Sequence, residues 1–119
     1  MIESQSPPFV VNSRRSQRVV ARIRVKVLRQ EDGGDILSED THTVVVNAHG
    51  ALVSLAMFVR PGESLTLENS ISRERKQIRV VRVGEKQASK HEVAIEFTTP
   101  TPRFWHIDFP PADWKLLQD

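Results

Sequence analysis

The feature that most restricts the fold of this chain is strict alternation over residues 19–28, which read VVARIRVKVL. The odd-numbered positions are all apolar: Val19, Ala21, Ile23, Val25 and Val27. The even-numbered positions include Arg22, Arg24 and Lys26. A period of two residues places the two sets on opposite faces of an extended chain, as in a β-strand with one buried face. The stretch therefore predicts a strand over residues 19–29 that borders an apolar core.

Five later segments have the same extended character. They are residues 41–46, 51–57, 64–68, 76–83 and 91–98, and turn sequences such as Gly33-Gly34 and Pro61-Gly62 separate some of them. Short strands at regular spacing are typical of an all-β sandwich or barrel. We therefore expect an all-β fold.

The chain has the size of one domain, with 119 residues of which 39% are hydrophobic. We predict a flexible arm over residues 1–12 and one domain over residues 13–119. The C-terminal part is rich in proline and holds four aromatic residues: Phe104, Trp105, Phe109 and Trp114. We expect this aromatic segment to pack over an open end of the barrel and a short helix to begin near Pro111.

Several classes of function lack a basis in the sequence. There is no cysteine, no secretory signal pattern, and no apolar run near the ~20 residues of a membrane span. The histidines do not have metal-ligand spacing, and no residues form a recognisable catalytic arrangement. We expect a cytoplasmic protein that does not insert into membranes, holds no metal or cofactor, and is not an enzyme.

Positive charge is concentrated in two segments rather than spread over the chain. The formal charge is only +2, from 17 basic and 15 acidic residues. Residues 13–30 nevertheless hold seven basic residues and no acidic one, and residues 73–82 hold Glu74 as their only acid. A high local density of positive charge favours an anionic ligand more than the net charge does.

Three arginines, Arg14, Arg15 and Arg18, directly precede the first predicted strand. A guanidinium group binds phosphate oxygens in pairs and stacks on flat rings. A compact ligand with two phosphates and two purines would match this cluster, and so would a nucleic-acid backbone. A solvated basic flank that binds nothing is a third interpretation. The nearly balanced total charge makes nucleic acid the less favoured ligand.

The order of these features resembles the PilZ domain family. The family has an RxxxR motif before its first strand, a [D/N]xSxxG motif between two later strands, and a last strand with a glycine–hydrophobic–x–phenylalanine pattern. The resemblance covers residues 13–97. It implies a six-stranded antiparallel β-barrel with a C-terminal helix and, in many members, binding of the bacterial second messenger cyclic di-GMP.

The resemblance also implies a set of ligand-binding residues. Arg14 and Arg18 match the first motif, whose arginines stack on guanine and bind phosphate, and Arg15 is an additional contact. In the second motif Gly50 matches the glycine, and Asn47 stands at the serine position. His49, beside Gly50, is a candidate to face the ligand, and the alternative is an ordinary exposed loop histidine. A shifted alignment would put Asn47 at the Asp/Asn position, but Gly50 would then come two residues early.

Three positions depart from the family pattern, Asn47 among them, and they leave two functions open. Val45 stands where Asp or Asn is expected, and Ala94 stands where glycine is usual. Losing one hydrogen bond to a polar ligand group costs about 1–3 kcal/mol, or about ten- to hundred-fold in affinity. The resemblance implies a cyclic di-GMP receptor that relays a signal to a partner protein. The departures imply an alternative, a protein-interaction module of the same fold that no longer binds cyclic di-GMP.

Overall fold

The computed structural model describes residues 18–101 and 103–107. The strands in these residues are β1 (Val19–Val20), β2 (Arg24–Gln30), β3 (Ile36–Asn47), β4 (Gly50–Leu55), β5 (Ser64–Asn69), β6 (Arg75–Gln87) and β7 (Lys90–Phe97). One turn of 3₁₀ helix, η1 (Asp32–Gly34), joins β2 to β3. The predicted arm over residues 1–12, the predicted helix near Pro111, and Phe109 and Trp114 lie outside the described residues.

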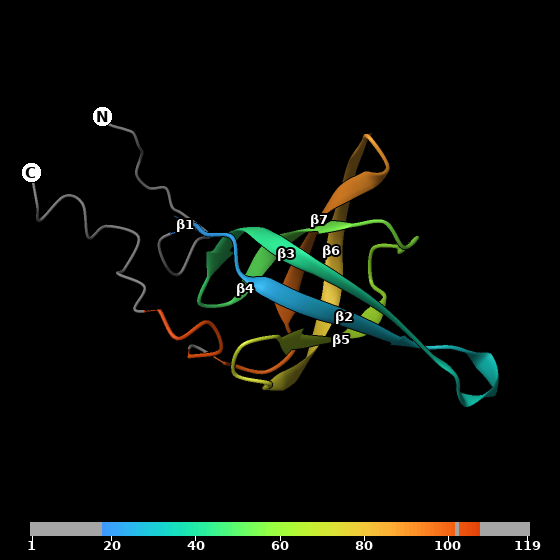
Figure 1. The fold of residues 1–119 in the computed structure, drawn as a ribbon, viewed down its shortest axis with the longest axis horizontal. Helices are drawn as coiled ribbons and strands as arrows, with labels where there is room; N and C mark the ends of the chain where they lie inside the picture. Colours follow the sequence, from blue (N-terminus) through green and yellow to red (C-terminus); the bar gives the residue numbers. More distant parts are fainter. Residues whose placement is uncertain (1–17, 102, 108–119) are drawn as a thin grey trace, which may run out of the picture.

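The strands form one antiparallel sheet that closes on itself (Figure 1). Their order is β1-β3-β2-β5-β6-β7-β4, and pairing of β4 with β3 completes the ring. The short strand β1 lies outside this ring and pairs with β3. Strands β2 to β7 therefore make a six-stranded antiparallel barrel, which confirms the fold predicted from the sequence.

Alternation along the strands separates the core from the surface. On β2, Val25 and Val27 are completely buried, whereas Arg24 is exposed. The same pattern places Ile78 and Val80 of β6 in the core. The aliphatic core residues are Val25, Val27, Val46, Val53, Leu55, Val59, Leu65, Leu67, Ile78, Val80, Val93 and Ile95. The inward face predicted for the first strand is confirmed, but the single strand expected over residues 19–29 is divided into β1 and β2.

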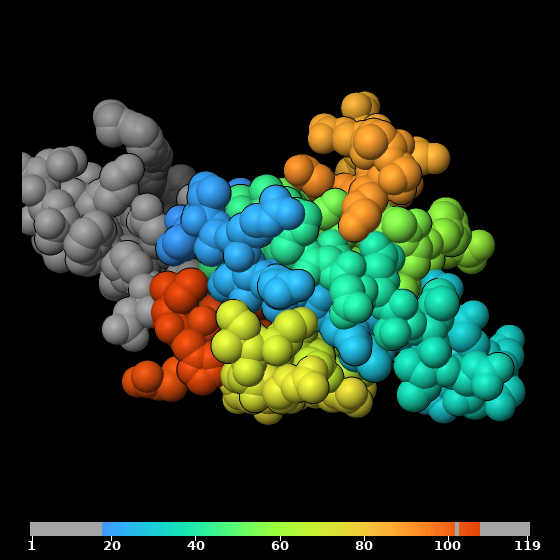
Figure 2. Space-filling model, in the orientation of Figure 1, coloured from blue at the N-terminus to red at the C-terminus, as the bar shows by residue number. Residues whose placement is uncertain are grey.

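Two hairpins extend beyond the barrel and make their strands longer than the sequence indicated. Strand β3 begins at Ile36, where residue 41 was expected, and Ile36 pairs with Gln30 of β2. Strand β6 runs to Gln87, which pairs with Lys90 of β7. Figure 2 shows both hairpins projecting from the body. Because their residues have little core to face, the alternation that marks a half-buried strand is lost there.

An aromatic cluster packs against the core at the end of the chain that the structure describes. Phe104 and Trp105 are buried, and their rings meet edge to face with centroids 4.9 Å apart. Phe97 at the end of β7 lies 5.0 Å from Phe104 and 5.9 Å from Trp105, centroid to centroid. For these residues the predicted packing of the aromatic segment on the barrel is confirmed.

Candidate functional site

The pairing of β1 with β3 brings Arg18 of the first predicted motif and Asn47 of the second to one end of the barrel. Val19 pairs with Val46 and Val20 pairs with Val45. Arg18 comes just before this ladder and Asn47 just after it, so the antiparallel register sets the two residues at the same end. Arg18 is exposed. Arg14 and Arg15 lie outside the described residues.

A bulge lies between β1 and β2 and changes the direction of the chain at β1, which follows directly after Arg18. Three residues, 21–23, face only two residues of β3 between the pairs Val20–Val45 and Arg24–His42. The Thr43 hydroxyl donates to the Ala21 carbonyl at 2.5 Å and accepts from the Ile23 amide at 2.9 Å. A bulge of this kind bends a strand and redirects what precedes it. Thr43 therefore fixes the direction in which β1 leaves the barrel.

The turn between β3 and β4 is held from three sides. The Asn47 side-chain oxygen accepts a hydrogen bond from the His49 amide at 2.8 Å. The Trp105 indole donates to the Asn47 carbonyl at 3.0 Å, and the Phe97 amide donates to the His49 carbonyl at 2.9 Å. The turn is therefore fixed to both the aromatic cluster and the end of β7.

Gly50 is required by the barrel itself. It pairs with both Asn47 of β3 and Glu96 of β7, and it is buried. A Cβ atom at this position would lie 2.1 Å from the Ile95 carbonyl oxygen, far inside van der Waals contact. Close approach of β7, rather than an unusual backbone angle, therefore explains this glycine.

The position expected to carry Asp or Asn lies in an apolar row on the outside of the barrel. Val45 pairs with Val20 on one side and Leu52 on the other, and Leu52 pairs with Ala94. Val20 is 85% exposed, and Leu52 and Ala94 are half-buried. We call these four residues the outer apolar row. They offer contact area but no side-chain hydrogen bond at this place.

His49 lines a groove that is bordered by the end of β7 and the residues that follow it. The groove has a volume of ≈ 340 Å³. Its lining residues are His49, Arg79, Glu96, Phe97, Thr98, Thr99, Pro100 and Thr101. Arg79 on β6 and Glu96 on β7 pair in register and form an ion pair across the strands. Sequence analysis did not identify this arginine and carboxylate as site residues, although both lie in predicted strands.

The second basic stretch is mostly neutralised by carboxylates. Glu68 is 4% exposed and binds the guanidinium groups of Arg73 at 3.1 Å and Arg75 at 2.7 Å. Arg79 pairs with Glu96 as described above. Phosphate groups would compete with these carboxylates, so this face is a poor match for a nucleic-acid backbone.

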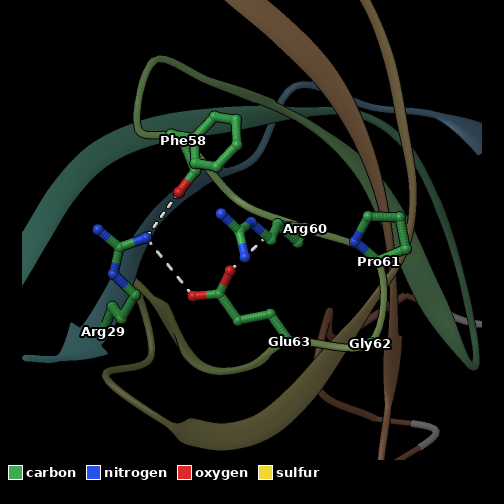
Figure 3. A pocket seen from close by; sticks show the side chains of 6 residues that line it. All are labelled: Arg29, Phe58, Arg60, Pro61, Gly62 and Glu63. Atoms are coloured by element: carbon green, nitrogen blue, oxygen red, sulfur yellow. Dashed lines mark hydrogen bonds and ion pairs between the residues drawn. The ribbon is translucent and has the colours of Figure 1, made fainter.

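A second hollow, of ≈ 510 Å³, lies at the connection between β4 and β5 (Figure 3). Arg29 donates to the Phe58 carbonyl at 2.6 Å and lies 3.4 Å from the Glu63 carboxylate. The hydrogen bond with Glu31 raises the pKa of Arg29. The Arg60 guanidinium lies 5.5 Å from the centre of the Phe58 ring. The charged groups here bind mainly one another, so we do not assign this hollow to the ligand.

Residues 18–101 and 103–107 lack two other kinds of feature. That part of the chain brings together no group of three or more His, Asp or Glu side chains that could hold a metal ion. It also contains no helix that is long and apolar enough to cross a membrane.

Comparison with known proteins supports the fold. No protein-family model matches this chain, and no curated protein matches it. Among solved structures, it is similar to the Bacillus subtilis inhibitor of motility (MotI/DgrA), with a TM-score of 0.58 and 20% sequence identity. The fold is a PilZ-like β-barrel. The match covers 76% of this chain but 44% of the other, so the chain spans less than half the length of that protein.

Proposed function

We propose that this chain is a PilZ-like receptor module that binds cyclic di-GMP and relays the signal to a partner protein in the cytoplasm. The observation that carries the proposal is the β1–β3 register. It places Arg18, the second arginine of the RxxxR motif, at the same end of the barrel as Asn47 and Gly50. Residues that are far apart in sequence are thereby set around one region of the surface.

In this proposal the two motifs form opposite walls of the ligand site. Arg14, Arg15 and Arg18 bind the phosphates and stack on guanine, because a guanidinium group offers both a donor fork and a flat face. Asn47 and His49 form the other wall beside Gly50. The Asn47 side-chain oxygen is used by the turn, so its amide N–H groups are the donors for the ligand.

Signal relay in this proposal depends on the segment that carries the arginines. It enters the sheet through β1, which adds only two residue pairs outside the closed ring. A ligand that contacts both the arginines and the β3–β4 turn binds the docked arrangement more tightly than the undocked one. Only such differential binding can shift the population between the two arrangements. A partner protein then recognises the docked form.

The test is isothermal titration calorimetry of the full chain with cyclic di-GMP. We expect saturable binding, and a loss of about ten- to hundred-fold in affinity for both Arg14→Ala and Arg18→Ala, since each removes a charged donor. Arg60→Ala is the matched control, because this exposed arginine lies in the other hollow. Absence of binding by the wild-type chain, with an unchanged melting temperature on adding nucleotide, would contradict the proposal.

A second candidate function is supported by the outer apolar row. Val20, Val45 and Leu52 present an aliphatic surface where the family pattern has a polar ligand contact. Exposed aliphatic surface next to basic residues suits a protein interface. In this alternative the barrel binds a partner without nucleotide. Capture of that partner would then be independent of cyclic di-GMP, and unaffected by Arg14→Ala and Arg18→Ala.

A further inference from the structure

An ion pair on the outer face of the barrel leaves one carboxylate oxygen available. Arg79 Nε donates to Glu96 Oε2 at 3.0 Å, and Arg79 Nη2 donates to the same oxygen. Within residues 18–101 and 103–107, no hydrogen bond reaches Glu96 Oε1. The Arg79 and Glu96 side chains are 55% and 41% exposed. The arginine thus orients the carboxylate while one oxygen stays accessible as an acceptor.

This carboxylate lies in the same cross-strand row as the second motif. Asn47 pairs with Gly50, Gly50 pairs with Glu96, and Glu96 pairs with Arg79. Gly50 has no side chain, so none projects from the position between Asn47 and Glu96 in this row. The two residues are separated by two strand spacings, or about 10 Å. A ligand with two purines is long enough to contact both positions.

The groove beside the ion pair has the dimensions of a small-molecule site. Its volume of ≈ 340 Å³ falls within the range of ligand pockets, which is roughly 300–1,000 Å³. His49 from the turn and Phe97 from β7 are among the residues that line it. A planar base in this groove would have Glu96 and Arg79 beside its edge.

Guanine fits this pair of groups better than the other purine does. Its N1–H and 2-amino donors lie side by side on one edge, so either can donate to the accessible Glu96 Oε1, and its O6 and N7 are acceptors that arginine binds. Adenine has an unprotonated N1 and no 2-amino group, so it would set an acceptor against the carboxylate.

We propose that Glu96 is a specificity-determining residue that binds the donor edge of one guanine of cyclic di-GMP, with Arg79 as its positioning residue. This inference rests on the proposed function. It also accounts for Val45, because the chain then carries its guanine-reading carboxylate on β7 instead of on β3. The alternative role for Glu96 and Arg79 is that of a surface ion pair between β6 and β7 that contributes only to stability.

The experiment compares cyclic di-GMP with cyclic di-AMP in calorimetric titrations of the full chain. The wild-type chain is expected to prefer cyclic di-GMP. Glu96→Gln should lower the affinity for cyclic di-GMP by about ten-fold or more. Affinity for cyclic di-AMP should not fall, because the glutamine amide can donate to adenine N1. The ratio of the two affinities is therefore the readout.

Two further sets of variants separate recognition from folding. Glu92→Gln is the matched control, since Glu92 lies on the same face of β7, four residues away, and pairs with Ser54. It should leave the affinity ratio unchanged. Arg79→Ala should reduce the ratio, and Arg79→Lys should recover part of it, which a purely structural role would not produce. Melting temperatures confirm that each variant is folded.

The outcomes distinguish this inference from the function on which it rests. If the wild-type chain binds cyclic di-GMP but Glu96→Gln keeps the wild-type affinity ratio, Glu96 does not read guanine and the proposed function stands. If the wild-type chain binds neither nucleotide, the proposed function is wrong and this inference fails with it.

Discussion

The indole Nε1–H of Trp105 donates a hydrogen bond to the backbone carbonyl of Asn47, 3.0 Å away. These residues are separated by 58 positions in sequence. The bond joins the aromatic cluster to the turn that carries Asn47, His49 and Gly50. The geometry of the candidate site therefore depends on a residue that lies outside both motifs.

Trp105→Phe should destabilise the barrel by about 1 kcal/mol, because it removes this hydrogen bond and keeps an apolar ring. Trp105→Ala should cost more, about 3–5 kcal/mol, because it also leaves a cavity in the cluster. Urea unfolding followed by circular dichroism measures both values. A Trp105→Phe variant as stable as the wild-type chain would show that the bond does not hold the turn.

Gly50→Ala should be strongly destabilising. The added Cβ would meet the Ile95 carbonyl oxygen at 2.1 Å and force β4 away from β7, at a cost of at least about 1–3 kcal/mol. Gly34→Ala is an informative comparison, because it has nothing within 4 Å and a φ of +95°. It should cost only the conformational strain of an alanine in that region. Equal effects of the two changes on the melting temperature would contradict this explanation.

Val45→Asn should increase affinity for cyclic di-GMP. The change restores a polar group at the position where the family has Asp or Asn, and one hydrogen bond to the ligand is worth about 1–3 kcal/mol, or about ten- to hundred-fold. Val44→Asn is the control, since Val44 is also half-buried and lies next to it on β3. Calorimetry provides the measurement. An unchanged affinity of the Val45→Asn variant would show that residue 45 does not contact the ligand.

Glu68 should make the stability depend on pH in the acid range. The hydrogen bond from Arg75 lowers the pKa of Glu68 below its ordinary value of 4.5, against the opposing effect of burial. A group with a lowered folded-state pKa stabilises the protein above its unfolded-state pKa, and this contribution is lost as the pH falls through the folded-state value. On acidification below about pH 5, the melting temperature of the Glu68→Gln variant should therefore fall less than that of the wild-type chain. An equal fall of the melting temperature in both proteins over a pH series would contradict this prediction.

The strands were predictable because alternation reports burial directly. The pattern at Val25 and Val27, and again at Val93 and Ile95, depends only on which face of each strand meets the core. The projecting hairpins were underestimated for the same reason, since residues such as Ile36, Leu37 and Ser38 at the start of β3 are exposed and face no core. The resemblance to a known family agreed with the six strands counted from the sequence and assigned Gly50 to the second motif.

The groove and the bulge were not predictable from local patterns. The bulge depends on the Thr43 hydroxyl, which reaches across to Ala21 and Ile23 from a different strand. Arg79 and Glu96 belong to separate strands, and only the β6–β7 register places them together. Predicting this ion pair would have required the register between β6 and β7, which the outward positions of Arg79 and Glu96 alone do not determine.

The ring of hydrogen-bonded strands is complete without β1. Its closure passes directly from β3 to β4, so detaching Val19 and Val20 would break two residue pairs while every barrel seam stayed intact. Amides of β1 should accordingly exchange with solvent through a local opening, long before those of β2. The barrel and β1 thus have separate free energies of opening. Substitutions in β1 can therefore change its stability without destabilising the barrel.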